Sequence, residues 1–190
     1  MDSKTIFSAL VPNAEAAARA SIAETLTTFG EPALKFTLEG GITVRVLESH
    51  QRYSEASPAL RRLSIDVDAW PAPPAGLFVV EERCVFLRSL SPMTVSHEFG
   101  HALDCVLGKG VYFSGCSSEI RAAFASARSF VTPYAATGLD EYFAESTRAY
   151  VDGCNDPASA WPKATRERLR KLDPAMFAII EQIFARFSSS

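Results

Sequence analysis

The alternation of apolar and polar residues predicts helices near both ends of the chain and strands between them. An alanine-rich segment begins at Asn13 and ends near Gly30, and its residues Ile22, Leu26 and Phe29 are spaced for one face of a helix. Asparagine is a common N-cap, and a glycine after the last apolar position is typical of a helix end. We therefore predict a packing helix over this segment.

The pattern then changes toward the two-residue period of strands. Residues 33–39 fit a strand or a short helix equally well, because their apolar positions satisfy both periods. Residues 42–47 alternate apolar with polar and are rich in β-branched side chains, which predicts a strand with one face in the core. Residues 77–80 and 84–87 flank a polar turn and predict a hairpin. A free edge of this hairpin would accept an extended peptide as an added strand, whereas pairing on both sides would exclude one.

A short helix and a stiff connection lie between these strands. Ser57 followed by Pro58 predicts the start of a helix that runs to Leu63. The stretch from Trp70 to Gly76 contains prolines at positions 71, 73 and 74, which predicts an extended connection. We favour a rigid linker over a ligand for a proline-binding domain.

After residue 90 the predicted elements are helical. Ser91 and Pro92 resemble an N-cap and a first-turn proline, and Gly108 predicts the end of the same helix. Four further helices are predicted over residues 119–128, 139–151, 163–171 and 174–187. We predict an α+β fold in a single domain over 1–190, with a helix and sheet part over 1–90 that includes the hairpin and a helical part over 91–190.

Composition narrows the class of protein. A chain of 190 residues with 47% hydrophobic residues can bury one substantial core and is short for two domains. The net charge of −3, without a basic cluster interleaved with aromatics, argues against nucleic acid as a partner. No apolar run is long enough to span a membrane and no signal-peptide pattern begins the chain, so as written it is expected in the cytoplasm, or outside the cell if a targeting segment has been removed. No pattern specifies an oligomeric state.

The four cysteines show no metal-binding or redox spacing. They are Cys84, Cys105, Cys116 and Cys154, and none forms a C-x-x-C pair. We expect free, mostly buried thiols in a reducing compartment rather than disulfides. If a disulfide forms, Cys105 and Cys116 are the first pair to test, because they flank a short glycine-containing loop.

The strongest chemical signal is the H-E-x-x-H pattern formed by His97, Glu98 and His101. Residues four apart lie on one face of a helix, so both histidines can bind one Zn²⁺ while Glu98 reaches a water bound to it. The metal lowers the pKa of that water towards about 7, and Glu98 can accept its proton during attack on a carbonyl. The alternative is two structural histidines on an ordinary helix. We favour zinc because two of the three histidines fall in this pattern and the surrounding residues suit a buried helix. The third, His50, lies upstream in a polar loop and is expected to be solvated and not a zinc ligand.

A catalytic zinc normally has three protein ligands, and several carboxylates are candidates for the third. Asp104 lies on the face of the first histidine but about 10 Å along the helix axis, which favours a supporting role. Glu119 follows two serines and fits a helix N-terminus better. Glu141 and Glu145 are four apart, so one could bind zinc while the other orients a histidine, or both could belong to a solvated stripe paired with Arg148. The pattern does not rank these two.

Three motifs together resemble a known family. They are H-E-F-G-H-A-L-D at 97–104, V-T-P-Y at 131–134 and E-Y-F-A-E at 141–145. They resemble the catalytic domain of anthrax lethal factor and the related Pro-Pro endopeptidases, and P-Y-A-A at 133–136 is similar to the Mlc titration factor peptidases. The resemblance covers residues 85–151 most clearly, and Tyr142 stands where the family usually has phenylalanine. It implies a gluzincin-type zinc metallopeptidase with a zincin-like fold, in which a small twisted sheet packs on the H-E-x-x-H helix.

The resemblance also implies roles for the later residues. In the family pattern the first glutamate of the last motif binds zinc, and a tyrosine seven residues before it assists catalysis; these positions are Glu141 and Tyr134. Glu145 then orients a ligand histidine, and Tyr134 donates a hydrogen bond to the developing oxyanion or the leaving group. We predict a zinc-dependent endopeptidase acting on a specific protein or peptide. The alternatives are a zinc-binding regulatory or interaction module that cuts nothing and an aminopeptidase of the Mlc titration factor type. The predicted site comprises His97, His101 and Glu141 for the metal, Glu98 and Tyr134 for catalysis, and Glu145 and Asp104 behind them.

Overall fold

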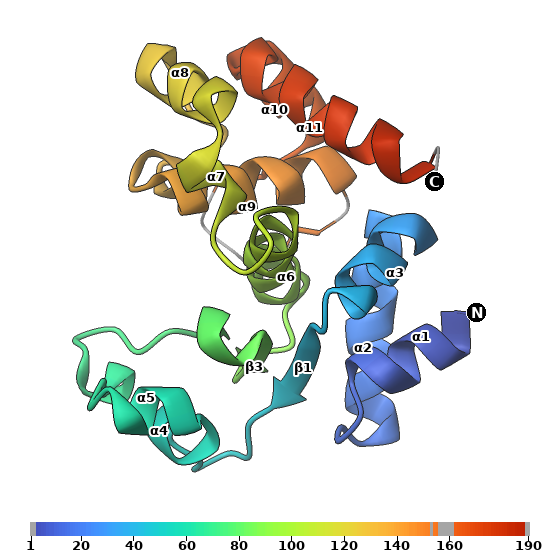
Figure 1. Ribbon diagram of the computed structural model, residues 1–190, viewed down its shortest axis with the longest axis vertical. Helices are drawn as coiled ribbons and strands as arrows, with labels where there is room; N and C mark the ends of the chain where they lie inside the picture. The colour runs from blue at the N-terminus through green and yellow to red at the C-terminus, as the bar shows by residue number, and fades with distance from the viewer. Residues whose placement is uncertain (1–2, 153, 156–161, 189–190) are drawn as a thin grey trace.

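The computed structural model describes residues 3–152, 154–155 and 162–188. The helix α6 (Pro92–Leu107) lies at the centre of Figure 1, between the small sheet on one side and the C-terminal helices on the other. Its predicted ends are confirmed: the Ser91 side chain accepts a hydrogen bond from the backbone N–H of Thr94, and Gly108 is the C-cap. Helices and one small sheet make up the described chain, which confirms the predicted α+β class.

Three helices precede the sheet, and the second and third of them contact α6. They are α1 (Ser3–Leu10), α2 (Ala16–Leu26), which the 3-10 helix η1 (Thr27–Phe29) extends, and α3 (Glu31–Glu39). The predicted packing helix is thus confirmed, the ambiguous segment at 33–39 is helical, and α1 is an element that the pattern did not predict. Phe29 meets Phe99 of α6 edge to face, with ring centroids 4.8 Å apart. These helices therefore support α6 from one side.

The sheet has three strands in the order β1-β3-β2. They are β1 (Thr43–Val46), β2 (Gly76–Val79) and β3 (Cys84–Leu87). β1 pairs with β3 in parallel, and β2 pairs with β3 antiparallel through the tight connection η3 (Val80–Glu82), which confirms the hairpin. Within the described part of the chain β2 is therefore an edge strand, paired with a strand on one side only. Its first residue, Gly76, lies against Thr94 and Glu98 of α6.

A segment between β1 and β2 fixes the start of β2. It contains α4 (Tyr53–Ala56), α5 (Pro58–Arg62) and the 3-10 helix η2 (Val67–Ala69), and α5 begins after Ser57 as predicted. The Tyr53 hydroxyl donates a hydrogen bond to the backbone oxygen of Pro74 at 2.9 Å. The Arg88 guanidinium lies over the Tyr53 ring, 4.5 Å from its centroid. The proline-containing connection is thus anchored just before β2 begins.

The C-terminal half is helical, as predicted. Its elements are α7 (Phe113–Cys116), α8 (Ser118–Ser126), the 3-10 helix η4 (Tyr134–Ala136), α9 (Leu139–Val151), α10 (Arg166–Leu172) and α11 (Pro174–Ser188). α7 and η4 were not predicted, and the ends of the others shift by a few residues. α9 lies directly beside α6 in Figure 1 and is buried along most of its length. It is the second helix of the candidate site.

Two further predictions concern thiols and membranes. Cys84, Cys105 and Cys154 are buried, Cys116 is exposed, and all four are free thiols as expected. Cys105 and Cys116 do not pair, because one lies in the core and the other on the surface. Among the described residues no helix has the length and apolar character that crossing a bilayer requires.

Candidate metal centre

The helices α6 and α9 approach each other closely because the facing positions are small. A Cβ atom at Gly100 would lie 2.9 Å from the Cα atom of Ala144 and 3.2 Å from its Cβ atom. Any side chain at Gly100 would therefore push the helices apart. This glycine precedes the second histidine of the H-E-x-x-H motif, so the contact lies where the two helices must share a site.

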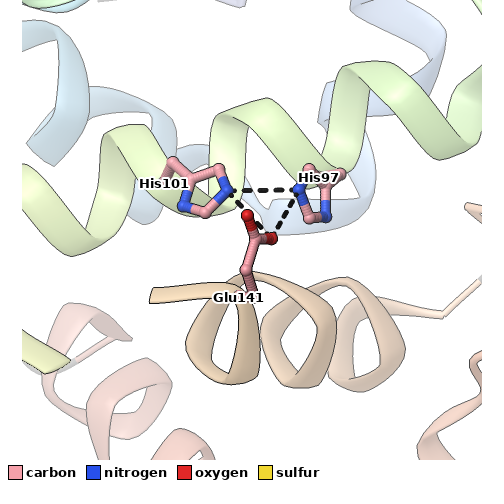
Figure 2. A group of neighbouring side chains, drawn as sticks. All are labelled: His97, His101 and Glu141. Atoms are coloured by element: carbon pink, nitrogen blue, oxygen red, sulfur yellow. Dashed lines mark hydrogen bonds and ion pairs between the residues drawn. The ribbon is translucent and has the colours of Figure 1, made fainter. Parts of the chain in front are cut away.

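Two histidines of α6 and one glutamate of α9 point toward one another across this contact (Figure 2). The Nε2 atoms of His97 and His101 are 3.1 Å apart. The Oε2 atom of Glu141 lies 3.1 Å from Nε2 of His97 and 3.4 Å from Nε2 of His101. Ligand atoms at about 2.0–2.1 Å from a tetrahedral zinc are separated from one another by about 3.3 Å. The three measured distances match three corners of such a tetrahedron.

The ionisation and the missing hydrogen bond of Glu141 also fit a metal ligand. Its Oε2 atom is buried and forms no hydrogen bond, although two ring nitrogens lie beside it. Burial by itself would raise the pKa of Glu141, but the imidazoles of His101 and His97 outweigh burial and lower that pKa to about 2. The carboxylate is therefore ionised. Two imidazoles and one carboxylate form the donor set of a catalytic zinc with one open position.

His97 is held from behind by a buried network. Its Nδ1 atom lies 2.9 Å from Oε1 of Glu145, so an N–H at Nδ1 donates to this carboxylate and leaves Nε2 facing Glu141. Glu145 also accepts hydrogen bonds from the hydroxyl of Thr132 at 2.6 Å and from Nε and Nη2 of Arg148 at 2.9 and 2.8 Å. Burial would raise the pKa of Glu145, but His97 and Arg148 hold it well below its usual range. The alternative of a solvated acidic stripe does not hold for Glu145, because Glu145 and its partner Arg148 are only 4% and 2% exposed.

His101 has no comparable support among the described residues. Its Nδ1 atom is buried and has no hydrogen-bond partner there. Asp104, one turn later, instead accepts hydrogen bonds from the backbone N–H and the hydroxyl of Ser114, at 2.8 and 2.6 Å. Burial raises the pKa of Asp104 to about 7. Its contacts therefore anchor α7 to α6 and are not directed at either histidine.

Glu98 faces the opposite side of the site, against the edge strand β2. It is 8% exposed, and burial raises its pKa although the backbone N–H of Phe78 nearby opposes that shift. A Cβ atom at Gly76 would lie 2.6 Å from Cγ of Glu98 and 2.8 Å from Cγ2 of Thr94. The first residue of β2 is therefore a glycine because the strand lies directly on the carboxylate.

Tyr134 lies beside the metal ligands at the start of η4. Its hydroxyl donates a hydrogen bond to Oε1 of Glu141 at 3.0 Å, and its ring centroid is 5.5 Å from that of His97. Burial and the Glu141 carboxylate raise the pKa of Tyr134, so the phenol stays protonated and can donate. The side chain is nevertheless 43% exposed, which leaves it accessible to a substrate.

A cavity of about 260 Å³ opens in front of these groups. Pro74, Ala75 and Gly76 form one wall, and Met93 and Tyr134 add apolar surface. The polar side of the cavity is formed by His97, Glu98, Glu145 and Arg148, with Thr94 beside them. The cavity thus joins a strand edge to the acidic and imidazole groups.

Not every candidate residue reaches the site. His50 is exposed in the loop after β1, and Glu119 is exposed in the first turn of α8, as expected for each. Thr132 and Gly76 contact site residues, and the sequence analysis assigned neither a role. Thr132 lies within the V-T-P-Y motif, whereas the position of Gly76 before a predicted strand gave no sign of its contact with Glu98.

Comparisons with known proteins place the fold. No protein-family model and no curated protein matches the chain. Among solved structures the chain is similar to the Pro-Pro endopeptidase PPEP-2 from Paenibacillus alvei, with 21% sequence identity and a TM-score of 0.65. The match covers 94% of this chain and 99% of the other. The two chains therefore share a fold over nearly their whole length.

Proposed function

We propose that this protein is a zinc-dependent endopeptidase of the zincin class with a gluzincin-type site. The observation that carries the proposal is the group of three ligand atoms from His97, His101 and Glu141, whose separations of 3.1, 3.1 and 3.4 Å suit a tetrahedral zinc. The position of Glu98 beside this group and the fold shared with a Pro-Pro endopeptidase support it. A zinc ion there would act as a Lewis acid that polarises a peptide carbonyl and acidifies water.

Two side chains of this site are placed for proton and charge transfer. Glu98, which packs against Gly76 and lines the cavity, accepts a proton from the attacking water and later returns it to the leaving amine. The Tyr134 phenol, after leaving Glu141, donates a hydrogen bond to the developing oxyanion or the leaving group. Glu98 is not needed to hold the metal, so its buried position favours an enzyme over a zinc-binding module that cuts nothing.

The edge strand β2 supports an extended peptide as the substrate. Its first residue, Gly76, lines the cavity together with Pro74 and Ala75, and β2 pairs with no strand other than β3 within the described residues. A peptide added along this edge would pass in front of Glu98 and His97 with its backbone held by main-chain hydrogen bonds. We therefore propose that the protein cuts within an extended segment of a specific protein or peptide.

Metal analysis and a peptide library test this proposal. We expect about one zinc per folded chain, cleavage of library peptides with blocked N-termini, and loss of cleavage on chelation that zinc reverses. Glu98→Ala should keep the zinc and lose the cleavage. A folded protein without stoichiometric zinc would contradict the metal site. Zinc without any cleavage would favour the binding module, and cleavage of unblocked peptides alone would favour an aminopeptidase.

A further inference from the structure

Arg148 is a buried cation whose hydrogen-bonding groups all face inside the protein. Nε and Nη2 bind the two oxygens of Glu145 as a fork, at 2.9 and 2.8 Å. Nη1 lies 3.4 Å from the backbone oxygen of Cys154 and 3.3 Å from Oδ1 of Asn155. All three nitrogens of the guanidinium are thus engaged, although the residue lines the candidate cavity. A substrate carboxylate could bind Arg148 only by displacing these partners, so we do not assign it to substrate binding.

The contacts of Arg148 form a chain that leads from the protein body to the metal ligands. Asn155 is itself held by residue Ala164, which donates its backbone N–H to Oδ1 at 2.8 Å and accepts from Nδ2 at 3.0 Å. From Arg148 the chain continues through Glu145 to Nδ1 of His97. A bidentate pair fixes the plane of a carboxylate as well as its distance. The Glu145 oxygen that faces His97 is therefore fixed in direction.

The two histidines differ in this respect. Nδ1 of His97 is bonded to the carboxylate that Arg148 holds, whereas Nδ1 of His101 has no partner within the described residues. The ring of His101 must take its orientation from packing, for example against Tyr112, whose ring centroid is 5.7 Å away. Of the two histidines, only His97 therefore has its ring orientation fixed by a hydrogen bond at Nδ1 within the described residues.

We propose that Arg148 is a positioning residue of the metal site, which acts through Glu145 to fix the imidazole of His97 with Nε2 toward the metal. This inference rests on the proposed zinc site. Groups behind metal ligands typically change metal affinity by about 10–100-fold when they are removed. Arg148 is one step further back, so its removal is expected near the lower end of that range.

Chelator competition on the purified full-length protein tests this role, using zinc affinity as the readout. We expect Arg148→Gln to weaken zinc binding about tenfold and Glu145→Gln to weaken it by about 10–100-fold. The double variant should bind zinc no more weakly than Glu145→Gln alone, because Arg148 acts through that carboxylate. Arg148→Lys, which keeps the charge but loses the fork, should fall between wild type and Arg148→Gln.

A matched control separates this role from a general loss of stability. Asp173 is also a buried carboxylate, which accepts hydrogen bonds from the Tyr142 hydroxyl and from the backbone N–H of Met176. Asp173→Asn should lower the melting temperature and leave zinc affinity within about twofold of wild type. If Arg148→Gln does not fold, the zinc affinities of Arg148→Lys and of the double variant Arg148→Lys with Glu145→Gln give the same comparison.

Two results would overturn the inference. One is zinc affinity of Arg148→Gln within about twofold of wild type, and the other is losses for Arg148→Gln and Glu145→Gln that multiply in the double variant. NMR of the zinc-loaded protein adds a direct readout, since the His97 Nδ1–H signal should be protected from exchange in wild type and lose that protection in Arg148→Gln. Zinc binding without peptide cleavage would contradict the proposed endopeptidase while this affinity comparison still supported the role of Arg148.

Discussion

The two faces of α6 differ in the contacts that hold their functional side chains. On the face toward α9, side chains hold one another: His97 is bonded to Glu145, which Arg148 and Thr132 bind in turn. On the face toward β2, Glu98 packs directly against the main chain at Gly76, where a side chain is missing. The α9 face is closed and ionic, which suits a metal. The β2 face borders an edge strand that pairs only with β3 within the described residues, and the cavity beside its first residue suits a peptide.

The largest expected effect is on the α9 face and compares its two glutamates. Glu141→Gln removes the anionic ligand and should weaken zinc binding by more than about 100-fold. Glu145→Gln should weaken zinc binding by only about 10–100-fold, and activity should fall although the metal still binds. Zinc titration against a chelator gives both values. The opposite order would show that Glu145 is the ligand and that the register of α9 has been misassigned.

Tyr134→Phe separates metal binding from catalysis. The phenol contacts Glu141 only through Oε1, while Oε2 faces the histidines. Removal of the hydroxyl should lower kcat by about 100-fold, as for other single donors to a developing oxyanion, and leave zinc affinity nearly unchanged. Steady-state kinetics on a library-derived peptide would measure this. An unchanged kcat would exclude Tyr134 from the reaction.

Gly100→Ala tests how strongly the metal site depends on the spacing of α6 and α9. The added methyl group would meet the Ala144 backbone, so the helices must separate, at a cost of about 1–3 kcal/mol in the free energy of unfolding. Zinc affinity should also fall, because the separated helices no longer hold the three ligands at the right spacing. Urea denaturation and zinc titration measure the two effects. Gly115→Ala is the matched control, because a Cβ atom there meets nothing within 4 Å.

Gly76→Ala tests the β2 face and should have the smallest effect. The new methyl group would displace the Glu98 carboxylate, so we expect kcat to fall about tenfold while zinc affinity is retained. Kinetics and zinc titration on the same sample would show the difference. If zinc affinity fell instead, the two faces of α6 would not be independent, and the comparison above would fail.

The sequence predicted features that depend on local geometry. The convergence of His97 and His101 follows from the helical period, and the predicted cap and end of α6 depend on neighbouring residues only. The fold class and the hairpin were predicted for the same reason. Residues 33–39 satisfied two periods, and only their packing beside α6 and the C-terminal helix selects the helix.

The remaining features depend on contacts between distant segments. Glu141 and Glu145 were equivalent by pattern, and a family resemblance was needed to separate them. A solvated stripe paired with Arg148 was the alternative for these two glutamates, but α9 is buried along most of its length, so its charges must pair internally. The contact of Gly76 with Glu98 is equally invisible in sequence, since no periodicity places a strand edge against a particular helix residue.

The proposed metal ligands lie on the two helices that meet at Gly100 and Ala144, so metal binding would be coupled to folding. The proposed ligands come from two helices joined by residues 108–138, so a zinc ion bound there would bind the folded chain and not the unfolded one. Each tenfold rise in free zinc above the dissociation constant would then add about 1.4 kcal/mol to the free energy of unfolding. The melting temperature would rise with free zinc, and the amount of folded protein in a cell would follow the zinc available to it.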